Sequence, residues 1–214
     1  MLEFISSQNA ENPEFAVVWL HGLGADGHDF ESIVHELELS EQAKIKFIFP
    51  HAPIMPVTIN GGMKMRAWYD IAYADLGSKP DLNGIVNSAK LIQEILDDLL
   101  KQGFTREKCF VVGFSQGGAV ALHLATEEKL AGVVALSSYG PTLTNAKEIK
   151  TENIWLGHGS FDGVVPPVLG ENTVKELERL GVVVPLNTYP MQHSVCLEEL
   201  SDLSQWFNRS VAGT

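Results

Sequence analysis

Residues 113–117, GFSQG, place a serine between glycines where the apolar run CFVVGF meets the helical pattern QGGAVALHLAT. A strand that turns sharply into a helix at a serine needs small neighbours, because a side chain there would clash with the pinched backbone. The positive end of the helix then lies beneath the hydroxyl, where negative charge develops during acyl transfer. This context predicts that Ser115 is a nucleophile, and the alternative is a serine that only caps a helix.

A serine hydroxyl needs a base to take its proton, and the base needs an acid that fixes its tautomer. In proteins with this strand, turn and helix arrangement, the chain order is serine, acid, histidine, each after a strand. Asp162 follows the run NIWLGHG, and His193 follows the run VPLNTYP. We therefore expect Asp162 and His193 to complete a catalytic triad with Ser115.

Other histidines and acids fit these roles less well. His193 is the histidine that follows the last expected strand, and Asp162 follows the strand before it. The remaining candidates lie within helical patterns, on a long loop, at a strand end, or in the wrong order, namely His28, His35, His51, His123, His158, Asp70, Asp75 and Asp202.

Two backbone amides are candidates for stabilising the oxyanion. One belongs to Gln116, directly after the serine, and the other to Leu23, in the glycine-containing loop after the run FAVVWL. Each such donor contributes about 3 to 4 kcal/mol to lowering the barrier. The alternative for the loop is a plain glycine turn in which His21 is hydrogen-bonded locally.

The sequence gives little support to a cofactor or metal. Residues 22–27, GLGADG, match the GxGxxG pattern of dinucleotide-binding proteins, but the next strand, IKFIFPHAP, ends without the acidic residue that would hold a ribose. No His, Cys or acidic pair has the usual ligand spacing for a metal. We expect neither group.

The elements that must position these residues alternate between strand and helix. Strands are expected at 15–20, 46–50, 109–114, 131–137, 153–159 and 184–190, with an edge strand at 2–5, and helices at 28–39, 83–102, 116–128, 168–180 and 195–208. This alternation predicts an α/β fold with a mostly parallel central sheet and helices on both faces. The absence of repeats and Gly/Ser-rich linkers predicts a single domain over 1–214.

Residues 50–71 interrupt the regular pattern with three prolines, a Gly61-Gly62 pair and several Met and aromatic side chains. We expect a long loop, and apolar loops of this length often line a binding site. The alternative is a loop that simply packs on the core.

The whole-chain properties limit the partners. The 214 residues carry a formal net charge of −12, which argues against nucleic acid and anionic lipid as general partners. Two cysteines and a start without a secretory pattern favour a soluble, cytoplasmic protein. No apolar run is long enough to span a bilayer, so any membrane contact is expected to be peripheral. The sequence does not decide between a monomer and a homodimer.

Several sequence blocks together resemble the acyl-protein thioesterase, phospholipase and carboxylesterase family of small α/β-hydrolases. The blocks extend over nearly the whole chain in one order: HGLGADG (21–27), FPHAPIMPVTINGG (49–62), AWYDI (67–71), GFSQGG (113–118), HGSFDGVVP (158–166) and YPMQHSV (189–195). The resemblance implies an α/β-hydrolase fold and a cofactor-free serine hydrolase acting on carboxylic ester or thioester bonds.

The same resemblance assigns roles to individual residues. Ser115, Asp162 and His193 would form the triad, and the Leu23 and Gln116 amides the oxyanion hole. Leu23, Trp68, Phe161 and Val164 would lie near the acyl chain. The family includes short-chain esterases, protein deacylases and lysophospholipases, and its motifs do not separate them. The alternative from another class is a catalytically inactive α/β-hydrolase that binds lipid or protein.

Overall fold

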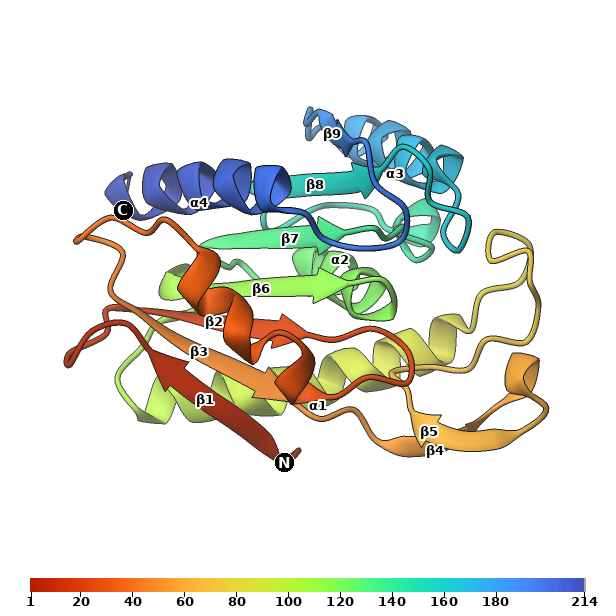
Figure 1. Ribbon diagram of the computed structural model, residues 1–214, viewed down its shortest axis with the longest axis horizontal. Helices are drawn as coiled ribbons and strands as arrows, with labels where there is room; N and C mark the ends of the chain where they lie inside the picture. Colours follow the sequence, from red (N-terminus) through yellow and green to blue (C-terminus); the bar gives the residue numbers. More distant parts are fainter. Residues whose placement is uncertain (214) are drawn as a thin grey trace.

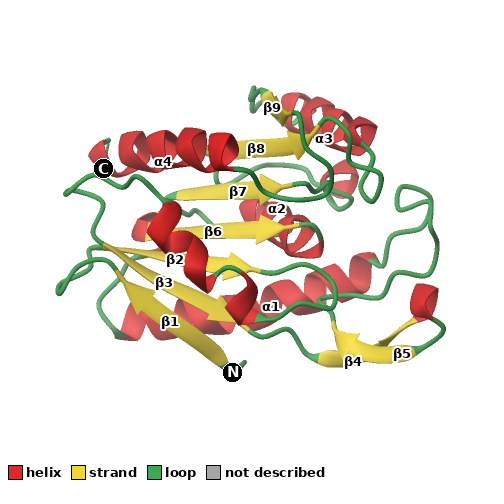
Figure 2. Ribbon diagram, in the orientation of Figure 1, coloured by secondary structure: helices red, strands yellow, loops and turns green. Residues whose placement is uncertain are grey.

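The computed structural model describes residues 1–213 of the chain. Its centre is a seven-stranded sheet in the order β1-β3-β2-β6-β7-β8-β9 (Figures 1 and 2). Strand β1 runs antiparallel to β3, and the other neighbouring pairs are parallel. The strands are β1 (Phe4–Gln8), β2 (Phe15–Leu20), β3 (Ile45–Pro50), β6 (Cys109–Phe114), β7 (Gly132–Leu136), β8 (Ile154–Gly159) and β9 (Leu186–Tyr189).

Helices cover both faces of this sheet, which confirms the expected architecture. One face packs against α1 (Leu82–Lys101), α2 (Gln116–Glu127) and α3 (Pro167–Arg179). The other packs against α4 (Leu197–Ala212) and the short 3-10 helices η1 (Gly27–Asp29) and η2 (Glu31–Glu36). Two further 3-10 turns, η4 (Arg106–Lys108) and η5 (Leu143–Asn145), lie in connections.

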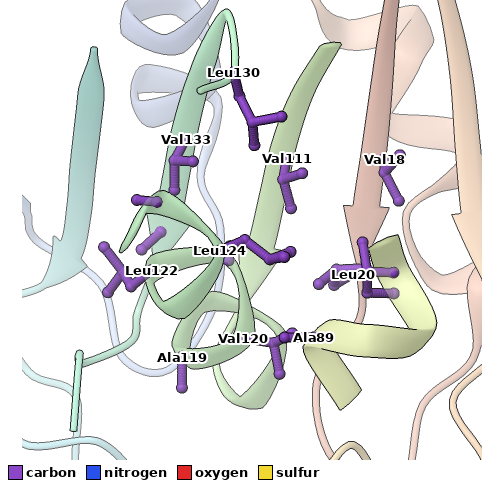
Figure 3. Close-up of a cluster of buried hydrophobic side chains, with 14 of the residues drawn as sticks. Val18, Leu20, Ala89, Val111, Ala119, Val120, Leu122, Leu124, Leu130 and Val133 are labelled. Carbon is purple, nitrogen blue, oxygen red and sulfur yellow. The ribbon is translucent and has the colours of Figure 1, made fainter. Parts of the chain in front are cut away.

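The central strands are buried on both faces because successive side chains alternate between two cores. Val18, Leu20, Val111 and Val133 point towards α1 and α2, where they meet Ala89 and the apolar side of α2 (Figure 3). The intervening residues, among them Val17, Trp19, Phe110 and Val112, belong to the core beneath α4. This explains why the strands read as continuous apolar runs.

The helix expected at 28–39 is wrong. The segment forms only η1 and η2 and becomes extended from Leu37. The end of the segment is tied to helix α4, since the amide of Glu38 donates to Ser204 Oγ (3.0 Å) and that of Ser40 to Asn208 Oδ1 (2.8 Å). These long-range partners replace the hydrogen bonds that a continuing helix would need.

The expectation of an irregular loop over residues 50–71 is also wrong in part. The segment contains an antiparallel hairpin of β4 (Ile54–Val57) and β5 (Met63–Arg66), joined through the 3-10 turn η3 (Thr58–Asn60). Gly61 and Gly62 close the hairpin with φ of 66° and 78°, a left-handed conformation that glycine adopts without strain. The hairpin projects beyond the main sheet (Figure 1).

Parallel pairing brings the carboxyl ends of β2, β6, β8 and β9 to one edge of the sheet. The loops that carry Leu23, Ser115, Asp162 and His193 all begin at this edge. Such an edge is where open α/β sheets place ligands. Among the described helices, none is long and apolar enough to cross a membrane.

Candidate active site

Ser115 occupies a tight turn between β6 and α2 with φ 54° and ψ −117°. This conformation is costly for a residue other than glycine and recurs at functional sites that hold it in place. Two hydrogen bonds hold it here: the Ser115 amide donates to Leu136 O (2.9 Å), and Ser138 Oγ donates to Ser115 O (2.6 Å).

The glycines around Ser115 are required by space. A Cβ on Gly113 would lie 2.1 Å from the carbonyl of Gly117, and one on Gly117 would lie 2.5 Å from Leu20 O. Both distances are far below van der Waals contact with backbone that cannot move aside. The small residues of the GFSQG block are thus explained by the close approach of β6, α2 and β2.

His193 links Ser115 to Asp162. Its Nε2 lies 3.0 Å from Ser115 Oγ, and its Nδ1 lies 2.7 Å from Asp162 Oδ2. A carboxylate only accepts hydrogen bonds, so Nδ1 carries a proton and the neutral ring presents Nε2 to the hydroxyl as an acceptor. The three residues expected to act together therefore form one chain of hydrogen bonds.

Asp162 is held in one orientation by its own loop. Its side chain is fully buried, and Oδ1 accepts hydrogen bonds from the amides of Val164 and Val165, both at 2.8 Å. The buried His158 braces this loop, because its Nε2 donates to Val165 O (2.9 Å) and lies 3.6 Å from Asp162 Oδ2. Oδ2 is left to receive His193.

Ser115 and His193 open into a cavity of about 520 Å³. The cavity also reaches Leu23 and Gln116, and much of its remaining wall is apolar, with Tyr69, Ile71, Ala74, Leu76 and Tyr139 among the lining residues. A concave, largely apolar space with a few convergent polar groups is typical of a small-molecule site. Its size and position suit a substrate with an apolar portion.

The Leu23 and Gln116 amides are free to donate into this cavity. Gln116 is the first residue of α2, where a backbone N–H has no partner within the helix. Within residues 1–213, neither amide donates a hydrogen bond to another protein group. Two unused donors beside a nucleophile are what an oxyanion site needs.

The loop that carries Leu23 is fixed by the buried His21. His21 Nδ1 donates to Gly22 O (2.7 Å), while Nε2 accepts from the Ala52 amide (3.0 Å). Burial lowers the pKa of His21, which agrees with the neutral ring that these two bonds require. His21 is hydrogen-bonded locally, as the alternative for this loop supposed, and the Leu23 amide is nevertheless left without a protein acceptor within residues 1–213.

Trp68 does not line the cavity, contrary to its expected place beside the acyl chain. It is 2% exposed, and its Nε1 donates to His21 O (2.8 Å). Its amide donates to Gln116 Oε1 (3.1 Å), whose Nε2 in turn donates to Tyr69 O (2.6 Å). Trp68 therefore packs behind the candidate oxyanion site and ties its two halves together.

The other two expected acyl contacts differ from each other. Val164 lines the cavity, whereas Phe161 lies outside it with its side chain 68% exposed. The backbone turns between the two residues. The Phe161 amide donates to Met191 O, and the Val164 amide donates to Asp162 Oδ1.

Sequence reasoning missed several cavity residues, among them Asp29 and Tyr139. Tyr139 had a detectable signal, since it follows the end of a parallel strand, whereas Asp29 lay in a segment misread as a regular helix. Within residues 1–213, no group of three or more His, Cys, Asp or Glu side chains is arranged to hold a metal.

Comparison with known proteins finds relatives that match nearly the whole chain. The phospholipase/carboxylesterase family model matches residues 3–211. Acyl-protein thioesterase 1 of Neurospora crassa is 37% identical, covering 89% of this chain and 84% of its own length. Carboxylesterase SOBER1 of Arabidopsis thaliana is 32% identical, covering 92% and 91%. The crystal structure of SOBER1 superimposes with a TM-score of 0.83 over 92% of this chain and 99% of that one, at 29% identity.

Proposed function

The chain belongs to the phospholipase/carboxylesterase family and is a carboxylic ester hydrolase, and we propose that it cleaves acyl esters and thioesters through Ser115, His193 and Asp162. The observation that carries this proposal is the unbroken hydrogen-bonded chain from Asp162 through His193 to Ser115 Oγ, at the wall of an apolar cavity. The α/β-hydrolase fold supports it, since that fold presents a serine nucleophile at this edge of the sheet.

In the first step, Ser115 Oγ attacks the carbonyl carbon while its proton passes to His193 Nε2. The carbonyl oxygen gains negative charge and is stabilised by the Leu23 and Gln116 amides. Asp162 holds the ring in place and stabilises the imidazolium that forms. The bond to the leaving oxygen or sulfur then breaks as Nε2–H gives its proton to that atom, which leaves an acyl group on Ser115.

In the second step, water takes the place of the departed alcohol or thiol. His193 Nε2 removes a proton from the water as it attacks the acyl carbon, and the same two amides receive the second oxyanion. Collapse of this intermediate breaks the bond to Ser115 Oγ, which recovers its proton from Nε2. The products are a carboxylic acid and the free hydroxyl of Ser115.

The cavity supports an apolar acyl group as the substrate portion that it holds. Tyr69, Ile71, Leu76 and Tyr139 form an apolar wall of the same cavity that Ser115 lines. Each buried methylene contributes about 0.8 kcal/mol, or roughly fourfold in affinity, until the space is filled. We therefore propose that kcat/KM rises with acyl-chain length up to a limit set by this wall.

The test is a series of matched oxygen esters and thioesters of saturated acids, with Ser115→Ala as the blank. The proposal expects hydrolysis of both bond types by the wild-type protein and a loss of several orders of magnitude in the variant. If Ser115→Ala kept the wild-type rate, the proposed nucleophile would be wrong. Ligand binding without turnover by the wild-type protein would contradict the proposed mechanism.

A further inference from the structure

A second, smaller cavity of about 290 Å³ adjoins His193. It is lined by Phe30, Ser32, Ile33, Ser194 and Val195, and it shares Asp29, Phe114 and His193 with the larger cavity. The rings of Phe114 and His193 lie 4.8 Å apart between centroids, so this pair forms a common wall. The candidate base thus borders both cavities.

Acyl transfer requires two spaces of this kind. The carbonyl oxygen must face the Leu23 and Gln116 amides, and the acyl chain fits the apolar wall of the larger cavity. The leaving oxygen or sulfur must come within hydrogen-bond reach of His193 Nε2 to receive its proton. The remainder of the leaving group therefore extends past His193, where the smaller cavity provides room.

The chemistry of the smaller cavity favours a positive charge. Asp29 is exposed at its edge, and within residues 1–213 its carboxylate has no ion pair or side-chain hydrogen bond. Phe30 and Phe114, whose ring centroids lie 5.6 Å apart, contribute aromatic surface beside it. A carboxylate together with aromatic rings is a recurring environment for ammonium and guanidinium groups.

The segments on both sides of the cavity add no competing cation with a permanent charge. Residues 1–43, which carry Asp29, contain no Lys or Arg, and residues 180–214, which carry His193, contain only Arg209. The neighbouring His28 faces Glu31 at 3.2 Å. Arg66 of β5 acts on the neighbouring Asp26. A cationic group that entered the smaller cavity would meet the unpaired carboxylate of Asp29.

We propose that the smaller cavity binds the leaving group and that Asp29 makes the enzyme prefer a positively charged leaving group to a negatively charged one. The inference rests on the proposed function, because it needs an acyl transfer at Ser115. The matching chemistry is an amine, guanidinium or quaternary ammonium attached to the departing thiol or alcohol, in a small molecule or in a basic peptide.

The test compares thioesters with one acyl group and different thiols: thiocholine, neutral N-acetylcysteamine and 3-mercaptopropionate. The ratio of kcat/KM for the cationic thiol to that for the anionic thiol should be about tenfold at low salt, and it should fall as salt is added. Asp29→Asn should bring this ratio to within about threefold of one. Using the ratio cancels any general loss of activity in the variant.

Glu152→Gln is the matched control, because it removes an exposed carboxylate just before β8, at the opposite end of that strand from Asp162. Its ratio should equal that of the wild-type protein. A ratio that Asp29→Asn leaves unchanged, or a wild-type preference for the anionic thiol, would overturn the inference.

Two S-acyl peptides, with Lys or with Glu on both sides of the cysteine, identify the source of the charge. Dependence on Asp29 for the Lys peptide indicates a basic protein segment, whereas dependence for thiocholine alone indicates a small ammonium compound, and either supports the inference. Hydrolysis of the neutral thioester separates the two proposals. Its absence would contradict the proposed function itself, and this inference would fall with it.

Discussion

At the scale of residues, the candidate site depends on which atoms are already occupied. Asp162 Oδ1 accepts two backbone amides, so Oδ2 alone is left for His193. The ring therefore carries its proton on Nδ1 and offers Nε2 to Ser115. The role of Asp162 in fixing the tautomer of His193 can therefore be tested by a substitution that keeps the shape of its side chain and removes the charge.

Asp162→Asn should lower kcat by about 10⁴-fold while the protein stays folded. The asparagine amide group would donate to Nδ1, and this would force the proton onto Nε2 and remove the acceptor that Ser115 needs. Steady-state kinetics on a thioester measure the loss, and circular dichroism checks the fold. A decrease of less than tenfold would show that Asp162 does not set the tautomer.

Trp68→Phe tests the place of this side chain behind the oxyanion site. The substitution removes the hydrogen bond from Nε1 to His21 O and keeps an aromatic ring. We expect kcat/KM to fall by about tenfold, the order expected from one buried hydrogen bond, and equally for short and long acyl chains. A loss that grows with chain length would instead place Trp68 in contact with the acyl group.

At the scale of elements, helix α4 carries a buried acidic side chain away from the proposed chemistry. Glu199, in its first turn, is fully buried, and the backbone of Cys196 offers its carboxyl group a hydrogen bond that offsets only part of the effect of burial. The carboxyl group packs so closely on β8 that a Cβ on Gly157 would lie 2.1 Å from Oε1. Burial raises the pKa of Glu199 to about 8.

The raised pKa makes stability depend on pH. The folded protein keeps a proton on Glu199 that the unfolded chain releases above about pH 4.5, so the unfolding free energy falls as pH rises from there to about 8. Glu199→Gln removes this contribution. Relative to wild type, the variant should gain about 3 to 5 kcal/mol between pH 5 and 8.

Urea unfolding of both proteins at several pH values measures this difference. Glu198→Gln is the control, because its neighbouring side chain is exposed and should show no comparable trend. A difference between Glu199→Gln and wild type that stays constant with pH would mean that Glu199 is ionised in the folded state.

The elements were predictable where the sequence pattern and the local structure agree. The runs at 15–20 and 109–114 have the bounds of β2 and β6, because strands buried on both faces need continuous apolar residues. The segment 28–39 was not predictable, since its end is tied to Ser204 and Asn208 of α4. The Gly61-Gly62 pair was an available hairpin signal that the prolines around it obscured.

At the scale of the whole molecule, the parallel sheet explains why residues far apart in sequence meet. Ser115, Asp162 and His193 follow different strands whose carboxyl ends share one edge, and this order was readable from the sequence. The second cavity beside His193 was not, because its walls come from η1, η2 and the loop before α4. Only the folded chain brings Asp29 beside His193, which the smaller cavity shares with the larger one.

The proposed mechanism requires that Ser115 carries the acyl group during turnover. The most direct measurement is intact-protein and peptide mass spectrometry after rapid acid quench of the enzyme during turnover of a thioester. We predict one added acyl mass on the peptide that contains Ser115, and none with Ser115→Ala. An acyl group on another residue such as Cys196, or full turnover by Ser115→Ala, would contradict the account.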